Sequence, residues 1–456
     1  MSMNITIVGG GYVGTVTGAV CRFFGHNVTI LDTDRRKIDL LSKGKSPIYE
    51  PGLEELLQMP GTPFVCTTSY EAAVPDADII FITVGTPTDL EGAPNMTYVQ
   101  DAAYQIGLNL GPGYTLIVNK STVPVGSGNW VESIVGDAFL SRNGHRPDGT
   151  FSVASNPEFL REGSAIHDTF YADRIVVGSG EAKAIAMLSD LYQPLRNQDF
   201  VPPPFVPRPE GVSAVPLVTT DLTSAEMIKY AANAFLTVKI SFINEIARLA
   251  EKVGADVTQL SRGIGLDSRI GSRFLQAGIG WGGSCFGKDT AALASMAREY
   301  GETMHIVEAA RHVNCRQREL AVEKVLSELR ILKGCSIGIL GVAFKANTDD
   351  LRDAPALDIA KRLIGRGAKV LAHDPVALPR ARSEAAIPNL HYKDSPAEVF
   401  EGASAILLAT DWQEYRRLPY ADLRGAMKAS TFLDGRNFLD PEEMTAYGYR
   451  YIGVGR

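Results

Sequence analysis

The sequence predicts an α/β protein with two Rossmann-like, doubly wound parallel-sheet domains joined by a long central helix. Short apolar runs alternate with helical patterns over the first 180 residues, and the alternation resumes near Ser336. Between these sections, residues 224–252 have the spacing of one long helix. We therefore expect domains at residues 1–212, 213–330 and 331–456.

The first alternating section contains six β-rich runs. The expected strands are Asn4–Val8, Asn27–Leu31, Ile79–Val84, Thr115–Asn119, Phe151–Ala154 and Arg174–Gly178. The expected helices are Val13–Phe24, Arg35–Lys43, Tyr98–Leu110 and Gly126–Leu140. The segment Val201–Pro209 contains five prolines and is expected to be a surface loop.

The long helix follows this loop. Asp221 or Thr223 can cap it, and Gly254 is expected to end it. At 1.5 Å per residue it would span roughly 45 Å, enough to connect two domains or to form a dimer core. Its apolar positions recur at spacings of three and four: Met227, Ala231, Ala234, Phe235, Val238, Phe242 and Ile246.

The second alternating section repeats the order of the first. A strand Ser336–Leu340 ends in Gly341, and a helix is expected at Pro355–Ile364. A strand Lys369–Ala372 then leads to Asp374, and Ala405–Ala409 is a further strand. A strand, a glycine, a helix, a second strand and an acidic residue follow one another in the order that is typical of a Rossmann-like domain. We therefore expect a second such domain here.

Composition excludes several classes of protein. Hydrophobic residues make up 45% and charged residues 21%, as in globular proteins, and no apolar run reaches the roughly 18 residues of a membrane span. The net charge of −7 argues against nucleic-acid or anionic-membrane partners. The residues from Met1 to Gly14 do not resemble a signal peptide. The five cysteines are Cys21, Cys66, Cys285, Cys315 and Cys335. No pair of them has zinc-type spacing, so we expect no metal site and a location in the reducing cytoplasm.

The residues Gly9–Gly14 match the pattern G-x-G-x-x-G directly after a strand and at the start of a helix. Gly9 permits the tight turn, Gly11 lets the backbone approach a pyrophosphate, and Gly14 allows close helix–sheet packing. Asp32 ends the next strand, where a carboxylate can accept both ribose hydroxyls and would repel a 2′-phosphate. We therefore expect NAD rather than NADP. The alternative is a glycine-rich turn without a ligand.

Cys285 lies in the segment Trp281–Asp289, where two glycines precede an expected helix start. The helix dipole and nearby Lys288 would lower the pKa of the thiol there, and Asp289 would share its helix face. In a dehydrogenase, a thiol beside a carboxylate suggests covalent capture of an aldehyde. The alternative is a buried structural cysteine.

Lys229 and Asn233 lie four residues apart on the long helix and interrupt an otherwise apolar stretch. Buried donors of this kind could stabilise an oxyanion. A solvated edge position for Lys229 is equally compatible with the spacing.

With these motifs in order, the chain resembles the UDP-glucose/GDP-mannose dehydrogenase family, and most closely its members that act on UDP-glucose. The resemblance covers nearly the whole length and rests on many ordered motifs. They are Gly9–Gly14, Ile48–Leu53, Gly85–Thr88, Ser121–Gly126, Asn156–Gly163, Lys229–Asn233, Asp267–Gly271, Gly282–Asp289, Ala343–Lys345 and Asp434–Arg436.

Members of this family oxidise the C6 alcohol of a sugar nucleotide to a carboxylate with two NAD⁺ per sugar. The resemblance implies that the Cys285 thiolate attacks the C6 aldehyde to form a thiohemiacetal, whose oxidation gives a thioester that water hydrolyses. Lys229 and Asn233 would stabilise the alkoxide or oxyanion. The groups implied to position the water and handle protons are Asp289, Thr122 and Glu158. The base of the first oxidation is left open.

The resemblance also implies binding residues. Besides the glycines and Asp32, those for NAD are Val13, Lys37, Thr86, Thr122, Lys288 and Arg352. Those for the sugar nucleotide are Glu158, Phe159, Leu160, Arg161, Glu162, Lys229, Arg269, Phe274, Leu275, Gln276, Ala277, Gly278, Gly282, Lys345 and Arg436. The site is expected in a cleft between the two Rossmann-like domains, with Arg269 supplied by a neighbouring subunit. The cations among these residues would hold a diphosphate on an acidic chain, although each alone could be a solvated surface charge.

The segment Arg269-Ile270-Gly271 favours UDP-glucose as the substrate. The same chemistry on GDP-mannose or a UDP-N-acetylhexosamine is an alternative. Others are a two-electron dehydrogenase and a non-catalytic sugar-nucleotide sensor. Trp281 and Gln276 depart from the family, which usually has Phe and Lys or Asn there. As in the family, we expect a homodimer formed through the long helix.

Overall fold

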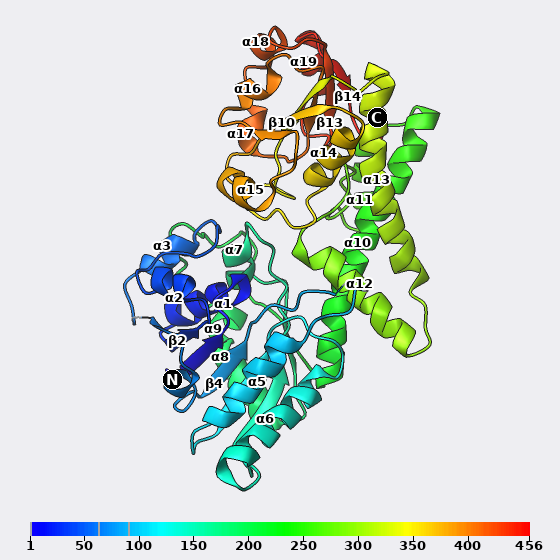
Figure 1. The fold of residues 1–456 in the computed structure, drawn as a ribbon. Coiled ribbons are helices and arrows are strands. Elements are labelled where there is room, and N and C mark those ends of the chain that lie inside the picture. The colour runs from blue at the N-terminus through cyan, green and yellow to red at the C-terminus, as the bar shows by residue number, and fades with distance from the viewer. Residues whose placement is uncertain (1, 63, 90–91) are drawn as a thin grey trace. The chain divides into compact units, whose positions relative to one another are not determined.

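The structure is a computed structural model that describes residues 2–62, 64–89 and 92–456. It forms two compact units, residues 1–231 and 232–456, each built around one sheet (Figure 1). In both sheets the helices lie on the two faces, as expected of a doubly wound α/β fold. The predicted fold class is therefore confirmed, while the three-domain boundaries stay a prediction.

The first unit contains a sheet with the strand order β3-β2-β1-β4-β5-β6-β7-β8, in which only the β6–β7 pair is antiparallel among the described strands. The strands are β1 (Asn4–Val8), β2 (Asn27–Leu31), β3 (Val65–Thr67), β4 (Ile79–Ile82), β5 (Thr115–Asn119), β6 (Phe151–Ser155), β7 (Ile175–Gly178) and β8 (Leu217–Thr220). The helices are α1 (Tyr12–Phe23), α2 (Arg35–Leu41), α3 (Leu53–Gln58), α4 (Tyr70–Ala73), α5 (Thr97–Asn109), α6 (Ser127–Asn143), α7 (Ala165–Phe170), α8 (Ala182–Leu191) and α9 (Gln193–Asn197).

Strand β4 shows why this sequence forms a central strand. All four of its residues are fully buried. Ile79 and Phe81 pack in one hydrophobic cluster with α1, α3 and α7, whereas Ile80 and Ile82 pack in another with α5 and α6. Side chains alternate between the two faces of a strand, so a continuous apolar run fits only a sheet covered on both sides.

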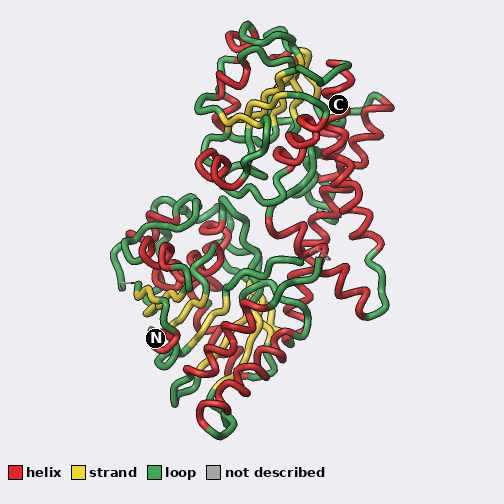
Figure 2. The backbone as a smooth tube through the Cα atoms, in the orientation of Figure 1, coloured by secondary structure: helices red, strands yellow, loops and turns green. Residues whose placement is uncertain are grey.

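The second unit contains a six-stranded sheet with the order β11-β10-β9-β12-β13-β14. The strands are β9 (Ser336–Leu340), β10 (Lys369–His373), β11 (Leu390–Tyr392), β12 (Ala405–Leu408), β13 (Thr431–Asp434) and β14 (Arg450–Ile452). Helices α13 (His305–Leu329) and α14 (Pro355–Gly365) pack on one face, and α16 (Pro396–Phe400) and α18 (Tyr420–Arg424) pack on the other (Figure 2). The remaining helices are α11 (Val257–Gly265), α12 (Ser284–Glu299), α15 (Leu378–Glu384), α17 (Gln413–Arg416) and α19 (Pro441–Ala446).

The predicted long helix is α10, Leu222–Val253, with 32 residues. Asp221 caps it, since its Oδ1 accepts the Ser224 N–H at 2.8 Å, and Gly254 ends it with a φ of 74°. The sequence prediction of both ends is confirmed.

Other predicted elements differ from the structure only at their ends. Helix α2 stops at Leu41, where the last residues assigned to it form a turn, and β4 stops at Ile82, after which the chain leaves the sheet. Five short strands were not predicted, and they contain three or four residues each: β3, β8, β11, β13 and β14. The proline-rich segment Val201–Pro209 contains neither helix nor strand, as expected. Among the described helices, none combines the length and apolar character needed to cross a bilayer.

Candidate active site

The glycine fingerprint occupies the turn between β1 and α1. Gly9 has a φ of 111°, and a Cβ there would lie 2.9 Å from the backbone of Thr83. A Cβ on Gly14 would lie 1.9 Å from the Gly9 carbonyl oxygen, whereas a Cβ on Gly11 would meet nothing within 4 Å. Gly9 and Gly14 are thus required by the fold itself. Gly11 leaves an open approach to the first N–H groups of α1, which suits an anionic ligand.

Asp32 lies beside this turn, at the carboxyl end of β2. Its Oδ2 accepts the Gly10 N–H at 2.8 Å and lies 3.1 Å from Lys37 Nζ. Its Oδ1 accepts the Asp34 N–H at 2.8 Å. The carboxylate is therefore fixed next to the glycine turn, as expected for a group that holds the ribose of a dinucleotide.

Further predicted residues follow the next strands at the same edge of the sheet. Thr86 follows β4, and its hydroxyl donates to the carbonyl of Thr122, which follows β5, at 2.8 Å. Glu158 follows β6. The carboxyl ends of parallel strands are where ligands bind in open α/β sheets, so the structure brings the predicted NAD residues of this unit to one edge. Val13 lies in the first turn of α1.

Glu158 and Lys229 form a buried ion pair, with Lys229 Nζ 2.9 Å from Glu158 Oε1. The side chains are 7% and 4% exposed, so the solvated alternative for Lys229 is wrong. Burial alone would raise the pKa of the Glu158 carboxyl. Three neighbours outweigh the effect of burial and lower the pKa of Glu158. They are Lys229, through its charge and hydrogen bond, the Leu160 N–H at 2.7 Å, and Lys120, through its charge. Glu158 is therefore held as a carboxylate.

The segment after Glu158, predicted to bind substrate, is fixed from two sides. Glu50 accepts the Gly163 and Ala165 N–H groups at 2.6 and 2.7 Å, which explains the acid in the motif Ile48–Leu53. Arg161 pairs with Asp168 through two hydrogen bonds of 2.9 and 2.6 Å. The remaining predicted residues here, Phe159, Leu160 and Glu162, are partly exposed.

Cys285 lies in the first turn of α12, as predicted, and is partly exposed. The two glycines before it are explained by close approach of the β9–α14 loop. A Cβ on Gly282 would lie 2.2 Å from the Asp353 carbonyl oxygen, and one on Gly283 would lie 2.8 Å from the Phe344 ring. The Gly283 N–H donates to the Arg352 carbonyl at 3.0 Å. The helix start that carries the thiol is therefore anchored to this loop.

Asp289 follows Cys285 one turn later and is fully buried. Its Oδ2 accepts the Asn233 side-chain amide at 2.6 Å, and Lys288 Nζ lies 2.9 Å from its Oδ1. The structure thus joins two predicted catalytic residues from different helices, α10 and α12. The carboxylate, one helical turn after the thiol, can position a water molecule, and the amide can donate to an oxyanion.

The predicted substrate residues of the second unit fall into two groups. Phe274, with a φ of 65°, begins a segment whose Gly278 N–H donates to Asn244 Oδ1 at 2.8 Å. A Cβ on Gly278 would lie 2.7 Å from the Gly435 carbonyl oxygen, so this segment packs against the loop that carries Arg436. Leu275 and Ala277 are buried and Gln276 is exposed.

The cations of this unit differ in their surroundings. Arg436 is partly exposed, and its guanidinium donates to the carbonyls of Ala409, Gly280 and Phe344 at 2.7, 3.3 and 3.2 Å. Arg352 makes hydrogen bonds of 2.8 and 3.0 Å to Asp350. Lys345 Nζ lies 5.4 Å from the centre of the Phe344 ring. Arg269 is paired with Asp267, with its side chain 87% exposed.

Sequence reasoning missed the residues that hold these groups in place. Asn314 on α13 accepts the Trp281 N–H at 2.7 Å and donates to its carbonyl at 2.9 Å. Arg318, one turn later, donates to the Trp281 carbonyl and to Asp353 Oδ1 at 2.8 and 2.7 Å. The sequence contains one signal for these two residues, which is that they are polar and lie four positions apart on an amphipathic helix. Among the described residues, no group of three or more His, Cys, Asp or Glu side chains forms a metal site.

Comparisons with known proteins agree with this geometry. Residues 3–196, 223–316 and 338–441 match the models of the NAD binding, central and UDP binding domains of the UDP-glucose/GDP-mannose dehydrogenase family. The chain is 45% identical to UDP-glucose 6-dehydrogenase TuaD of Bacillus subtilis, over 99% of this chain and 93% of that protein. It is 41% identical to the UDP-glucose 6-dehydrogenase of Rhizobium meliloti, with full coverage of both.

Two solved structures have the same fold. A UDP-glucose dehydrogenase from Pyrobaculum islandicum superposes with a TM-score of 0.86 at 35% identity, covering 100% of this chain and 98% of that one. A UDP-D-ManNAc dehydrogenase from Pyrococcus horikoshii superposes with a TM-score of 0.81 at 26% identity, covering 100% and 99%. The chain therefore belongs to the UDP-glucose/GDP-mannose dehydrogenase family, and NAD is its cofactor.

Proposed function

We propose that this protein oxidises the C6 alcohol of UDP-glucose to the carboxylate of UDP-glucuronate, with two NAD⁺ per sugar and covalent capture at Cys285. One observation carries the proposal. Cys285 lies in the first turn of α12, one turn before Asp289, whose carboxylate accepts a hydrogen bond from the Asn233 side chain. A two-electron alcohol dehydrogenase has no use for this arrangement. The full-length relatives at 41–45% identity are UDP-glucose 6-dehydrogenases.

The residues of the first unit fit NAD. Gly11 leaves room beside the first N–H groups of α1, and Asp32 is fixed against Gly10 at the end of β2. When bound, NAD⁺ accepts a hydride from the sugar carbon in each oxidation. The helix start would hold the pyrophosphate and Asp32 a ribose, with Val13, Lys37, Thr86 and Thr122 as the further contacts in this unit. Lys288 and Arg352 of the second unit complete the proposed set.

The chain's own groups supply the covalent chemistry. Oxidation of the C6 alcohol releases one hydride and one proton and leaves an aldehyde. The Cys285 thiolate adds to that aldehyde, and the resulting oxyanion is stabilised by Lys229 and Asn233. Loss of a second hydride from the thiohemiacetal gives a thioester on Cys285.

Hydrolysis of the thioester completes the reaction. Water adds to the thioester carbonyl, the C–S bond breaks, and the Cys285 thiolate leaves. Asp289 and Glu158 carry carboxylates suited to position that water and accept its proton, with Thr122 as a further contact. The base of the first oxidation is not assigned. The cations proposed to hold the diphosphate are Lys345, Arg436 and Arg269, the last from a neighbouring subunit.

A homodimer is part of the proposal. On α10, Phe235, Phe242 and Leu249 are spaced by seven residues and are 64%, 49% and 57% exposed. An apolar stripe of this period is typical of a helix that packs against another helix, here in a second copy of the chain. Sedimentation of the parent as a monomer at micromolar concentration would remove this part of the proposal. Phe242→Glu should shift a dimer towards monomer.

The decisive experiment measures stoichiometry and product together. The parent should release two NADH per UDP-glucose and form the uronic acid. Cys285→Ser should lose steady turnover, because a hydroxyl is a poor nucleophile at neutral pH, while NAD and UDP-glucose still bind. One NADH per sugar, or a Ser variant with near-parental turnover, would leave an ordinary alcohol dehydrogenase as the better interpretation.

A panel of sugar nucleotides tests the substrate. UDP-glucose should give the highest kcat/KM. A higher value with GDP-mannose or a UDP-N-acetylhexosamine would move the assignment to that sugar, and binding without NADH formation would indicate a sensor. Because the proposed nucleophile acts as a reduced thiol, we expect the protein in a reducing compartment such as the cytoplasm.

A further inference from the structure

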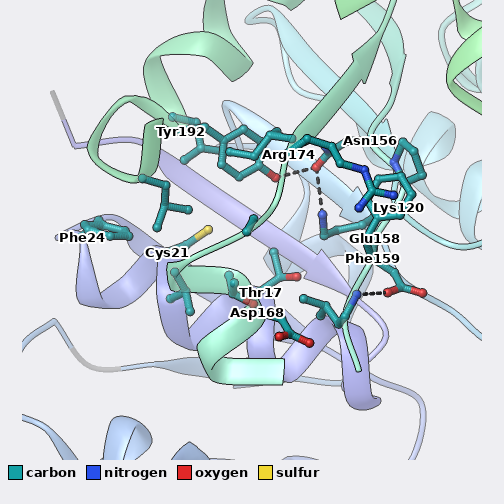
Figure 3. Close-up of a pocket in the computed structure, with 18 of the residues that line it drawn as sticks. Thr17, Cys21, Phe24, Lys120, Asn156, Glu158, Phe159, Asp168, Arg174 and Tyr192 are labelled. Atoms are coloured by element: carbon teal, nitrogen blue, oxygen red, sulfur yellow. Dashed lines mark hydrogen bonds between the residues drawn. The ribbon is translucent and has the colours of Figure 1, made fainter. Parts of the chain in front are cut away.

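Lys120 is a buried lysine that the proposed reaction does not use. It follows β5 directly and lines a cavity of the first unit whose other walls include Cys21, Glu158 and Tyr192 (Figure 3). Its Nζ donates to Asn156 Oδ1 at 2.9 Å and lies 6.0 Å from the centre of the Tyr192 ring. A buried ammonium is costly, so its presence calls for a function.

Asn156 connects Lys120 to the predicted catalytic carboxylate. Its Oδ1 accepts from Lys120 and from the Tyr192 hydroxyl, the latter at 2.5 Å, and its Nδ2 donates to the Val176 carbonyl at 2.7 Å. Figure 3 shows the two side chains converging on the same oxygen. Asn156 precedes Glu158 by two residues, with Pro157 between them. A fixed Asn156 therefore fixes the turn from which Glu158 projects.

Lys120 also acts on Glu158 through its charge. Glu158 is attracted by two ammonium groups, those of Lys229 and Lys120, and both lower the pKa of its carboxyl. In return, the charge of Glu158 favours protonation of Lys120, but burial outweighs it and lowers the pKa of Lys120 to about 8. The buried cluster thus carries two positive charges and one negative charge below that pH.

We propose that Lys120 is a positioning residue for Glu158, which orders the Asn156–Glu158 turn by a hydrogen bond and supplies a second positive charge to the surroundings of the carboxylate. This inference rests on the proposed role of Glu158 in the reaction. It adds a residue that acts through Glu158 and touches neither the sugar nor NAD in the proposed mechanism.

Two ionisable neighbours of Lys120, the Cys21 thiol and the Tyr192 hydroxyl, stay neutral at working pH. Burial raises the pKa of the Cys21 thiol on α1 to about 12 and that of Tyr192 well above its usual range. Three more groups line the cavity. Asp168 is paired with Arg161, Arg174 lies over the Phe159 ring at 3.7 Å, and burial lowers the pKa of His26. Between about pH 7 and 9, Lys120 is therefore the group of this cluster whose charge changes.

The test compares two variants that separate charge from hydrogen bonding. Lys120→Gln can still donate to Asn156 but has no charge. Tyr192→Phe removes the other donor to the same oxygen and keeps the charge. For each, kcat and the KM values for NAD and UDP-glucose are measured from pH 5.5 to 9.5 and expressed as the ratio of parent to variant. Titrations shared by both proteins cancel in that ratio.

For Lys120→Gln the ratio of kcat should rise towards about tenfold at the acid end of this range, where Glu158 of the variant takes up a proton that the parent excludes, and should fall towards one as the pH rises. The acid limb of the kcat–pH profile should lie about one pH unit higher in the variant than in the parent. The reason is that an opposite charge near a carboxyl, here that of Lys120 near Glu158, lowers its pKa by about that much or more. The KM for NAD should change less than twofold. For Tyr192→Phe the ratio should be constant with pH.

A ratio for Lys120→Gln that does not change from pH 5.5 to 9.5 would overturn the proposal, since a merely structural lysine affects all pH values alike. Glu158→Gln keeps the two inferences apart. If that variant turns over like the parent, the proposed role of Glu158 is wrong. If Glu158→Gln is slow while the kcat ratio for Lys120→Gln does not change with pH, only the positioning role of Lys120 is wrong.

A direct titration remains available if Lys120→Gln does not fold. In the full-length parent, carbon-13 NMR of labelled lysine ε-carbons should show one lysine with a midpoint near 8. Glu158→Gln should lower that midpoint, because the attracting charge is gone. A midpoint unaffected by Glu158→Gln would show that the two groups are not coupled, and the proposal would fall.

Discussion

The six strands of the second sheet follow the order of the first six strands of the first sheet, but the two sheets use the end of their second strand differently. Gly9 after β1 donates to the carbonyl of Leu31, the last residue of β2, at 2.8 Å. Gly341 after β9 donates to the carbonyl of His373, the last residue of β10, also at 2.8 Å. In both units an aspartate comes next along the chain. The two aspartates therefore occupy equivalent positions.

Their hydrogen bonds differ. Asp374 is fully buried and accepts from four backbone N–H groups, those of residues 342, 343, 376 and 377, and from Trp412 Nε1. Asp32 accepts from two backbone N–H groups and pairs with Lys37, whose side chain is 38% exposed. All lone pairs of Asp374 are occupied by donors of its own unit, whereas Asp32 accepts three hydrogen bonds and retains a lone pair for a ligand.

The glycine turns differ in the same way. Helix α1 starts directly after Gly9–Gly11, so its first N–H groups are offered at the strand end. In the second unit, Gly341 is followed by an extended loop that carries Lys345 and Arg352 before α14 begins at Pro355. One topology thus supports a helix start in one unit and a cationic loop in the other. Strand order alone does not determine what a Rossmann-like sheet binds.

The largest effect is expected from Asp374→Ala. Removing the carboxylate leaves several buried N–H groups without an acceptor, at about 1–3 kcal/mol each. We expect the transition of the second unit in calorimetry to move down by at least 10 °C or the variant not to fold. Asp32→Ala is the matched control, and equal losses of stability in the two variants would contradict the comparison.

The next effect concerns the glycines of the first unit. Gly14→Ala places a Cβ against the Gly9 carbonyl and should destabilise the protein by about 1–3 kcal/mol or more. Gly11→Ala meets no protein atom and should keep the thermal stability of the parent. It should still weaken NAD binding in calorimetric titration, because the methyl group blocks the approach to the helix start. Unchanged NAD affinity in Gly11→Ala would place the pyrophosphate elsewhere.

Asp32→Ala should have a smaller effect on the fold and a clear effect on the ligand. Loss of charged hydrogen bonds to the ribose, about 1.5–3 kcal/mol, should raise the Kd for NAD by about tenfold or more. UDP-glucose binding serves as the internal control and should be unchanged. If NAD bound as tightly to this variant as to the parent, the ribose contact would be wrongly assigned.

The smallest effect is expected from Lys37→Gln. The pair with Asp32 is partly exposed, so its loss should change stability by less than about 1 kcal/mol. The Kd for NAD should change less than in Asp32→Ala, as measured in the same titration. A larger effect than that of Asp32→Ala would make Lys37 the main cofactor contact of this edge.

Local patterns determined much of what the sequence alone could predict. The alternation of strands and helices, the fingerprint Gly9–Gly14, the ends of α10 and the helix start at Cys285 all depend on residues within a few positions of one another. Such short-range spacing is directly visible in a sequence. The short outer strands β3, β8, β11 and β14 were missed because three or four residues carry too little periodicity, and pairing with a neighbouring strand determines whether they form.

The tertiary structure decided which of these residues are partners. The pairs Lys229–Glu158 and Asn233–Asp289 join residues 71 and 56 positions apart, and Lys120 reaches Asn156 across 36 positions. No local pattern encodes such contacts, because they form only where helices and loops that are distant in the sequence pack together. The same holds for Asp32 and Asp374, which are equivalent in sequence order. Only their buried hydrogen-bond partners, contributed by distant loops, make one a candidate ligand contact and the other a part of the fold.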